Sequence, residues 1–450
     1  MLARSGVLSL AVSFLASHAA AVDLNIDSQD SIRSVAKALA KGVVTFYDDA
    51  LSESLVPGLF PDPYYWWEAG LAMNHLVEYY GLTNDSEYNA RISEALQHQL
   101  GEMDAFMPTN QTITAGNDDQ SSWGLASLSA HEAQLPAPIS GSWLQFAKNV
   151  FDIQTLRWDT DSCDGGLKWQ YFSFNDGYNY KNAASNSQLF LLAARLADQT
   201  GNATYAEWAA KVWQWSIEIG LVSADYDVYD GTDDRNNCSQ FNLIQWTSNH
   251  AVFTEGAAIM YNLSNASQNW TDVVTGLVNT SSIFQRDGDA LNEVACENNG
   301  RCDVDQRAFK GIAIRSFARA ARAAPIVADS IHAMLNASAQ GATQNCEVTG
   351  DDVACSLSWS SSSGNETWEQ NTAGDGNLGE ILNALSAVQA LLWRSVEFSN
   401  NTISSVSPNA TTSGSPSGAS GSVLPTGAGS TLTASFTYVL AVAFAVALGC

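Results

Sequence analysis

The stretch NAASNSQLFLLAARLADQT, residues 182–200, shows the pattern that decides the fold. Leu189, Leu192, Ala193 and Leu196 recur at spacings of three and four residues, which places them on one stripe of an α-helix. Further alanines in the stretch leave room for close packing between helices. The same periodicity returns along most of the chain, whereas sustained β alternation is scarce.

The periodicity predicts twelve helices in one domain. Twelve helices in a domain of this length suggest six antiparallel pairs, that is, an all-α (α/α)6 barrel. In such a six-hairpin toroid the inner helices surround a funnel, and the loops at one end build the site. The expected helices are Asp30–Tyr47, Tyr64–Tyr80, Ser86–Met103, Asp118–Gln134, Trp143–Arg157, Tyr180–Thr200, Tyr205–Leu221, Leu243–Tyr261, Trp270–Phe284, Val304–Ala321, Pro325–Ala339 and Leu378–Phe398.

Both ends of the chain have the composition of targeting segments. Arg4, an apolar run and the small residues before position 22 are typical of a secretory signal peptide. A Ser/Thr/Gly/Pro-rich segment without charge, residues 402–435, precedes the apolar terminus 436–450, and this order is typical of a glycosylphosphatidylinositol (GPI) attachment signal. A tail-anchored helix is the alternative, but the terminus is shorter than the roughly 20 residues needed to span a bilayer.

The expected organisation follows from these segments. We expect a signal peptide over residues 1–21, one helical domain over 22–398, a stalk with the anchor attachment region over 399–427, and a tail over 428–450 that is removed. The protein is then expected in the secretory pathway and at the outer face of the plasma membrane, which it would contact only through its lipid anchor.

The cysteines fit an oxidising compartment. Once Cys450 leaves with the tail, an even set of six remains, which suggests three disulfides whose connectivity several pairings would satisfy. The short separations favour Cys296–Cys302 and Cys346–Cys355, which leaves Cys163–Cys238.

Potential N-glycosylation sites are frequent, as secretion would allow. Each of the following asparagines opens an Asn-x-Ser/Thr sequon and should face solvent: Asn84, Asn110, Asn202, Asn237, Asn262, Asn265, Asn269, Asn279, Asn336, Asn365, Asn400 and Asn409.

Charge and motifs exclude several functions. A net charge of −27 disfavours nucleic acids and anionic membrane surfaces as partners. The chain has no Gly-x-Ser-x-Gly elbow, no His-Glu-x-x-His helix and no phosphate-binding loop, so we expect no cofactor and no metal. The acidic loop 225–234 misses the EF-hand register, because its glycine falls one position late and Tyr229 occupies position five. A non-standard calcium site stays open there.

Two adjacent carboxylates, Asp118 and Asp119, open one of the expected helices. A helix N-terminus tolerates two acids because its unpaired amides and its dipole favour negative charge. Adjacent helical side chains point about 100° apart and can flank one small object. A retaining glycosidase needs its two carboxyl groups about 5–5.5 Å apart. The structural alternative is an ordinary helix cap with one extra acid.

Aromatic residues gather beside neutral polar ones in several segments. The chain has 14 Trp and 14 Tyr, which is more than a helical core demands. Sugars stack on aromatic rings and offer hydroxyls to amide and carboxyl groups, so these segments suggest a polysaccharide cleft, although a single Trp at helical spacing is more often a core residue. The candidate sugar-binding residues in these segments are Trp66, Trp67, Trp169, Tyr180, Asn182, Asp230, Trp246 and Asn249.

The segment around the tandem aspartate resembles the catalytic signature of glycoside hydrolase family 76, the family of endo-α-1,6-mannanases and of fungal cell-wall transglycosylases. Further segments look like family motifs in the expected order, and the resemblance runs from about Leu24 to Phe398. The motifs are Gly116-Asn117-Asp118-Asp119-Gln120 with Trp123-Gly124-Leu125, Cys163-Asp164-Gly165-Gly166-Leu167-Lys168-Trp169-Gln170, Tyr180-Lys181-Asn182-Ala183 and Val228-Tyr229-Asp230-Gly231.

This resemblance implies an (α/α)6 barrel and a retaining mechanism on α-1,6-linked mannose. By position, Asp118 would be the nucleophile and Asp119 the acid/base, and Trp123 and Asp164 join the candidate sugar-binding residues. The resemblance to the fungal branch implies action on cell-wall α-1,6-mannan or on the mannose of GPI glycans, with β-glucan as an acceptor, in cell-wall biogenesis. We expect a monomer.

Two other functions compete with this hypothesis. A catalytically silent, wall-bound mannan-binding or scaffolding protein would keep the barrel without turnover, but it would have no reason to keep two adjacent acids. A different (α/α)6 sugar enzyme, such as an unsaturated-uronide hydrolase, is disfavoured by the acidity of the chain and by its lack of clustered arginine.

Overall fold

The computed structural model describes residues 20–286, 290–349, 351–359, 378–399 and 402–405. The expected signal peptide up to residue 19 and the expected stalk and tail from residue 406 lie outside the described residues, as do Asn365, Asn400 and Asn409. Within the described ranges, no helix combines the length and the apolar character needed to cross a membrane.

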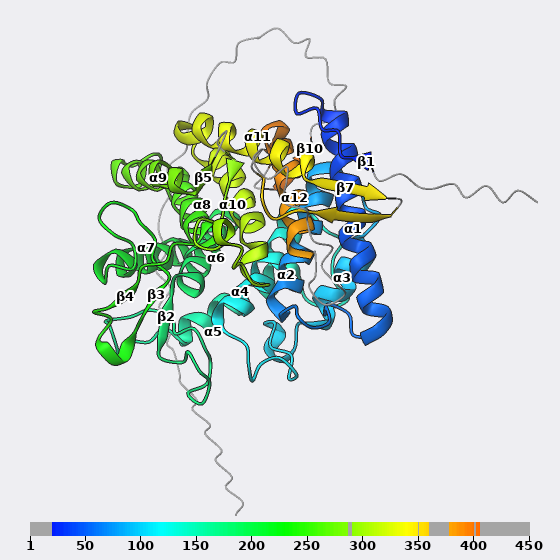
Figure 1. Ribbon diagram of the computed structural model, residues 1–450. Helices are drawn as coiled ribbons and strands as arrows, with labels where there is room; N and C mark the ends of the chain where they lie inside the picture. The colour runs from blue at the N-terminus through cyan, green and yellow to red at the C-terminus, as the bar shows by residue number, and fades with distance from the viewer. Residues whose placement is uncertain (1–19, 287–289, 350, 360–377, 400–401, 406–450) are drawn as a thin grey trace, which may run out of the picture. The chain divides into compact units, whose positions relative to one another are not determined.

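Twelve α-helices of the described region form an inner ring and an outer layer (Figure 1). Each even-numbered helix packs against the next even-numbered one, and α12 packs against α2, so that these helices close a ring that the odd-numbered helices cover. This is the (α/α)6 barrel that the sequence predicts. The inner helices are α2 (Trp66–Thr83), α4 (Asn117–Glu132), α6 (Ala183–Thr200), α8 (Thr247–Leu263), α10 (Phe309–Ala323) and α12 (Leu378–Ala390). The outer helices are α1 (Gln29–Ser54), α3 (Asn89–His98), α5 (Trp143–Leu156), α7 (Ala203–Glu218), α9 (Gln268–Thr280) and α11 (Ala328–Gln344).

Burial differs between the two layers. Residues 247–260 of α8 are all buried, whereas α9 buries only one apolar stripe against the ring. A helix that is surrounded by protein needs small residues where neighbours approach, and Gly70 shows this, because a Cβ there would lie 3.0 Å from the indole ring of Trp123.

The inner helices end in a buried network of charges, which we call the floor. Arg319 donates to Glu132 over 2.7 Å and to Glu255 over 2.6 Å, while Arg195 donates to Glu132 over 2.8 Å. Every acid of the floor has an arginine partner, which offsets the large cost of burying charge. The floor consists of Glu78, Glu132, Arg195, Glu255, Arg315 and Arg319.

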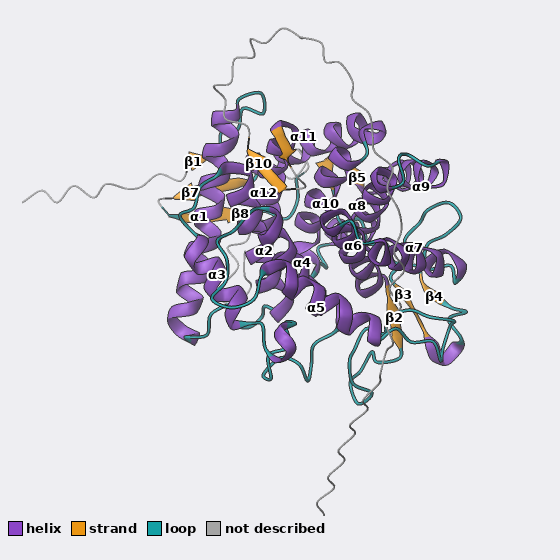
Figure 2. Cartoon of the chain, turned by 180° about the vertical axis from the view of Figure 1, so that it is seen from behind, coloured by secondary structure: helices purple, strands orange, loops and turns teal. Residues whose placement is uncertain are grey.

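Short strands and 3-10 helices lie in the segments that connect or flank the helices of the barrel. The antiparallel sheet β2-β3-β4 lies beside the starts of α6 and α8, near α5 and α7 in Figures 1 and 2. Its strands are β2 (Tyr180–Asn182), β3 (Gly231–Asp233) and β4 (Phe241–Asn242). The remaining strands are β1 (Ala20–Ala21), β5 (Gln285–Arg286), β6 (Ala290–Leu291), β7 (Cys346–Thr349), β8 (Asp352–Cys355), β9 (Val396–Ser399) and β10 (Thr402–Ser405). The 3-10 helices are η1 (Glu102–Asp104), η2 (Asp234–Asn236), η3 (Ser281–Phe284), η4 (Glu297–Asn299), η5 (Gln306–Ala308), η6 (Pro325–Val327) and η8 (Leu391–Ser395).

Three disulfides join the six cysteines in the pairing that their separations favour: Cys163–Cys238, Cys296–Cys302 and Cys346–Cys355. The sequon asparagines within the described residues are exposed, except for Asn336, which is partly buried and accepts a hydrogen bond from Arg394 over 2.9 Å.

Candidate active site

The inner helices begin at one end of the ring, which we call the mouth. Trp246, the N-cap of α8, packs against Phe309 at the start of α10, and Phe309 packs against Trp67 in the first turn of α2, with ring centroids 5.5 Å and 6.3 Å apart. Asn182, the N-cap of α6, reaches Asp118 at the start of α4. Helix N-termini have partial positive charge, so this end of the ring favours acidic side chains.

Asp118 and Asp119 occupy the first turn of α4, as the sequence predicts, and both side chains are partly buried. Oδ2 of Asp118 accepts a hydrogen bond from Nδ2 of Asn182 over 2.8 Å, and its Oδ1 accepts one from the main-chain N–H of Asp119 over 3.1 Å. Oδ2 of Asp119 accepts a hydrogen bond from the main-chain N–H of Gly116 over 2.6 Å. The Asp118 carboxyl group therefore accepts two hydrogen bonds, whereas that of Asp119 accepts one.

Glycine is required at position 116 because the site is crowded there. A Cβ on Gly116 would lie 2.5 Å from Oδ1 of Asp118 and 2.9 Å from Cδ1 of Trp169. Trp169 is 37% exposed, and its main-chain oxygen accepts a hydrogen bond from the N–H of Asn117 over 2.8 Å. Its ring thus lies beside the Asp118 carboxylate at the surface of the mouth.

The two acids differ in proton affinity. Burial raises the pKa of Asp118 to about 6, although hydrogen bonds from Asn182 and from main-chain N–H groups act to lower it. Burial also raises the pKa of Asp119 well above its usual range, and the neighbouring charge of Asp118 raises it further. Near neutral pH the arrangement therefore favours an ionised Asp118 beside a protonated Asp119.

Asp230 is held on both oxygens by three donors. Its Oδ1 accepts from Nε1 of Trp246 over 2.7 Å, and its Oδ2 accepts from the hydroxyl of Tyr180 over 2.6 Å and from Nδ2 of Asn242 over 3.0 Å. In the β2–β3 pairing, the neighbouring Gly231 lies opposite Asn182. Three residues that the sequence predicts, Tyr180, Asp230 and Trp246, are thus brought together beside the Asn182 that contacts Asp118.

A third acid of the mouth, Asp305, was missed by the sequence analysis. Its Oδ1 accepts a hydrogen bond from Nε1 of Trp67 over 2.9 Å, and its negative charge raises the pKa of both Asp118 and Asp119. Burial raises the pKa of Asp305 itself to about 6. The signal available in the sequence was its place at the start of an expected inner helix, the same place that Asp118 has in α4.

Within the described residues, no group of three or more His, Cys, Asp or Glu side chains is arranged to hold a metal ion. In the acidic loop 225–234, Asp230 accepts hydrogen bonds from side-chain donors and Asp233 pairs with Arg235, so both carboxylates already have protein partners.

The comparisons with known proteins agree with this geometry. Residues 31–402 match the model of glycosyl hydrolase family 76. The chain belongs to glycosyl hydrolase family 76. It is therefore similar, over nearly all of its described length, to enzymes of the glycoside hydrolase class.

Relatives and solved structures support the same assignment. The chain is 38% identical to the mannan endo-1,6-alpha-mannosidase DCW1 of Eremothecium gossypii, covering 87% of this chain and 86% of the relative. It is 38% identical to the DCW1 enzyme of Saccharomyces cerevisiae, covering 86% of this chain and 85% of the relative. Among solved structures, Dfg5 from Chaetomium thermophilum in complex with glucosamine has a TM-score of 0.77 and 35% identity, covering 85% of this chain and 94% of that one. An α-1,6-mannanase of Salegentibacter, crystallised as an inactive variant with α-1,6-mannotetrose, shares the fold with a TM-score of 0.62 at 17% identity, covering 80% of this chain and 98% of that one.

Two tryptophans of this family 76 protein lie in the core rather than at the mouth, which corrects the expectation that they bind sugar. Trp123 is fully buried and stacks between Trp66 and Phe106, with ring centroids 5.5 Å and 5.7 Å apart. Trp66 is 8% exposed, and its Nε1 donates to Gln99 over 2.9 Å. Both follow the ordinary rule that a tryptophan at helical spacing fills the core.

Asp164 and Asn249 are not joined to the other candidates by contacts among the described residues. Asp164 is exposed in a turn with φ of 55°, next to the Cys163–Cys238 disulfide. Asn249 is buried in the first turn of α8, and its side chain forms no hydrogen bond with another described residue.

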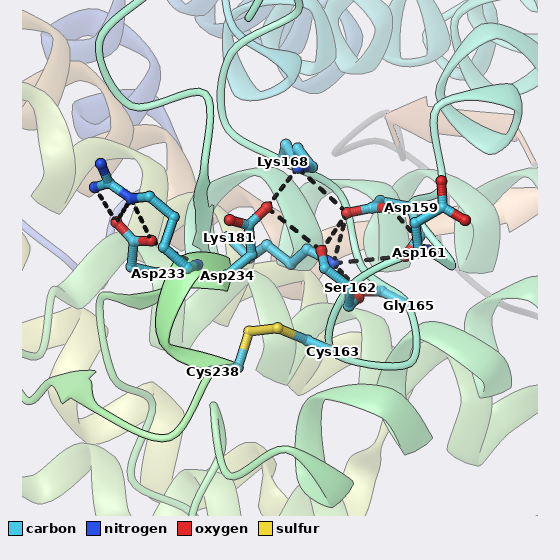
Figure 3. A network of polar contacts seen from close by, with 11 residues as sticks. Asp159, Asp161, Ser162, Cys163, Gly165, Lys168, Lys181, Asp233, Asp234 and Cys238 are labelled. Carbon is cyan, nitrogen blue, oxygen red and sulfur yellow. Dashed lines mark hydrogen bonds and ion pairs between the residues drawn. A yellow bond between two sulfur atoms is a disulfide. The ribbon is translucent and has the colours of Figure 1, made fainter.

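A polar network in Figure 3 fixes the loop that places Trp169. Lys181, fully buried, lies 3.1 Å from Asp159 and donates to the main-chain oxygen of Ser162 over 2.7 Å. Lys168 bridges Asp159 and Asp234. Together with the Cys163–Cys238 disulfide, these contacts tie residues 159–168 to the β2–β3 region.

Proposed function

We propose that this family 76 protein is a retaining endo-α-1,6-mannosidase in which Asp118 is the nucleophile and Asp119 the general acid/base. The proposal rests on one observation: of the two adjacent carboxyl groups, Asp118 accepts two hydrogen bonds and Asp119 accepts one. The group that accepts more hydrogen bonds is suited to be the anion, and the one with the higher pKa is suited to donate a proton. The names of the fungal relatives, mannan endo-1,6-alpha-mannosidase, supply the substrate class.

The reaction follows from these roles. Asp118 attacks the anomeric carbon of a mannose while Asp119 protonates the glycosidic oxygen, so that the bond to the leaving sugar breaks and a mannosyl ester forms on Asp118. Asp119, now ionised, accepts a proton from the incoming nucleophile, which displaces the ester. Water at this step gives hydrolysis, and a sugar hydroxyl gives transfer.

The finer biological role belongs to the same proposal. We place the enzyme on the secretory route, which three disulfides support, and at the cell surface through a GPI anchor. Its donors would be the α-1,6-mannose of cell-wall mannan or of GPI glycans, with β-glucan as an acceptor for transfer. The Salegentibacter mannanase supports the need for paired acids, because its inactive variant lacks two consecutive aspartates.

Anomeric analysis tests the two roles separately. With an aryl α-mannoside that extends into the site, Asp119→Ala plus azide should give the α-mannosyl azide, because the ester on Asp118 still forms and azide opens it. Asp118→Ala plus azide should give the β-mannosyl azide, because azide then replaces the nucleophile. The opposite pair of products would reverse the assignment.

A matched control is available on the outer helix α1, where Asp48 and Asp49 also stand side by side. Asp49 is exposed, so Asp49→Asn should leave turnover of α-1,6-mannan unchanged. If the wild-type protein bound mannan without releasing new reducing ends or transfer products, and both mouth variants kept that affinity, the silent scaffolding function would replace this proposal.

A further inference from the structure

Asp305 differs from Asp230 in how much of its carboxyl group is already used. Asp230 accepts hydrogen bonds on both oxygens. Asp305 accepts one, on Oδ1 from Trp67, and no described residue donates to its Oδ2. An ionised carboxylate has room for about four hydrogen bonds, so Asp305 keeps an oxygen for a ligand while Asp230 has mostly an orienting role.

Aromatic rings stand beside this carboxyl group. Trp67 holds Asp305 and packs against Phe309, and Phe309 in turn packs edge-on against Trp246 with an interplanar angle of 77°. Trp67, Phe309 and Trp246 are all partly exposed. A partly exposed carboxylate next to partly exposed rings offers both an acceptor for hydroxyls and an apolar face for the C–H side of a sugar ring.

The charges around Asp305 do not explain it as an ion pair. Within the described residues no lysine, arginine or histidine forms a salt bridge with it, and Arg307, two positions later, pairs with Glu380 instead. The titratable groups nearby are acids or phenols: Asp303 on its own loop, Tyr65 at the N-cap of α2 and Glu68 within α2. The charge of Asp305 also acts on Asp118 and Asp119 in α4, raising the pKa of each. A partly buried acid without a cation is costly to keep, which favours a role in binding.

We propose that Asp305, Trp67 and Phe309 form a sugar-binding subsite on the rim of the mouth. The Oδ2 of Asp305 accepts hydrogen bonds from hydroxyls of a neutral pyranose in the α-1,6-linked chain, and the rings of Trp67 and Phe309 contact the apolar face of that sugar. This inference rests on the proposed function, because it assigns a second sugar of the same substrate to the far side of the mouth from the Asp118 nucleophile.

Chain length distinguishes such a subsite from a general effect on catalysis. For Asp305→Asn, kcat/KM should fall about tenfold to hundredfold on α-1,6-mannooligosaccharides long enough to reach the subsite, since a hydrogen bond to a charged group is lost. On the shortest aryl mannoside that the wild type cleaves, kcat/KM should change by no more than about threefold, because this substrate does not reach Asp305 and loses no hydrogen bond. An equal loss at every chain length would overturn the subsite.

Two substitutions at this position separate binding from support of Trp67. Asn at position 305 retains an oxygen that accepts from the indole N–H, whereas Ala does not. If Asp305 serves only to hold Trp67, then Asp305→Asn behaves like the wild type on long chains and only Asp305→Ala is impaired, which would overturn the proposal. Asp303→Asn removes the same charge from an exposed neighbour and should leave the chain-length dependence unchanged.

Binding measurements keep this test independent of turnover. In the Asp119→Asn background, the affinity for α-1,6-mannotetraose measured by calorimetry should fall about tenfold or more on adding Asp305→Asn, and only slightly on adding Asp303→Asn. A wild-type protein without turnover would refute the proposed function and still leave this measurement to decide the subsite. Equal affinity with and without Asp305→Asn would refute the subsite alone.

Discussion

The two ends of the inner ring treat their acids in opposite ways. At the floor, Glu132 accepts from Arg195 and Arg319, and these arginines hold its pKa down to about 2 against the effect of burial. At the mouth, Asp118 and Asp305 have no cationic partner among the described residues, and burial raises the pKa of each to about 6. At the floor the acids are paired with arginines and stabilise the fold. At the mouth these two acids have a raised pKa and no such partner in the described part of the chain, as is common for reactive groups in active sites.

The largest expected effect comes from removing the acids of the mouth. Asp119→Asn should lower kcat on α-1,6-mannan by about 10²- to 10⁴-fold, the usual contribution of a general acid/base, and Asp118→Asn should abolish turnover. Release of reducing ends measures this, with Asp49→Asn as the reference. Turnover within twofold of the wild type in either variant would remove the assignment.

The floor should respond in stability rather than in chemistry. Glu132→Gln leaves Arg195 without its buried counter-charge and removes one of the acidic partners of Arg319, so the free energy of unfolding should fall by about 3–5 kcal/mol. Urea titration measures this, and kcat of the folded variant should stay near that of the wild type. A loss below about 0.5 kcal/mol, the range of an ordinary surface change, would show that the floor is not a stabilising network.

The pH dependence of activity should report the acids of the mouth. Turnover needs an ionised Asp118, whose pKa burial raises to about 6, and a protonated Asp119, whose pKa is raised further. We expect a bell-shaped profile of kcat/KM with an acidic limb near pH 6 and a basic limb at higher pH, both belonging to the coupled pair. A flat profile between pH 4 and 7, measured at constant ionic strength, would contradict it.

The pH dependence of stability should have opposite signs at the two ends. Glu132 has a lowered pKa in the folded state, so its contribution is present above the unfolded pKa and is lost as pH falls toward about 2. Asp119 has a raised pKa, so the folded state binds a proton that the unfolded state does not, and its contribution is lost as pH rises from about 4.

Asp119→Asn should therefore flatten the stability curve above pH 4, and its gain over the wild type should grow with pH. Glu132→Gln should instead reduce the steep loss of stability in acid. Chemical denaturation at several pH values from 3 to 8 distinguishes them. Parallel curves for the wild type and Asp119→Asn would mean that Asp119 has the same proton affinity in both states.

The fold and the reactive pair were predictable because they depend on local patterns. A period of 3.6 residues gives the twelve helices, and Asp118-Asp119 is a signal within one helical turn. The short strands were not expected, since β2, β3 and β4 have only two or three residues each, and β2 pairs with β3 across about 50 residues of chain.

The rest of the site depends on which side of a helix faces the mouth, which no local pattern gives. Trp66 and Trp67 are neighbours in sequence, yet Trp66 stacks in the core and Trp67 binds Asp305 at the rim. Asp305 itself resembled a first-turn acid of an ordinary helix. Its partner lies 238 positions away in the chain, so only the closed ring brings the two together.

The smallest expected effect lies in the loop beside the mouth. Lys168 bridges Asp159 and Asp234, and its main-chain oxygen accepts a hydrogen bond from Asn117, next to the reactive pair. Because the ion pairs are partly exposed and the disulfide of the same loop remains, Lys168→Met should weaken the placement of Trp169 without unfolding the loop.

For Lys168→Met we expect KM for mannan to rise by about two- to fivefold, a change of about 1 kcal/mol or less, with kcat nearly unchanged, because the Cys163–Cys238 disulfide and the hydrogen bond from Asn117 to the main-chain oxygen of residue 168 still hold the loop. Lys37→Met is the control away from the mouth, because Lys37 on α1 likewise bridges two acids, Asp85 and Glu87, which lie in the loop between α2 and α3. Its KM should equal that of the wild type. A loss in kcat rather than in KM for Lys168→Met would mean that this loop positions Asp118 itself, and the boundary between reactive and supporting residues at the mouth would have to include it.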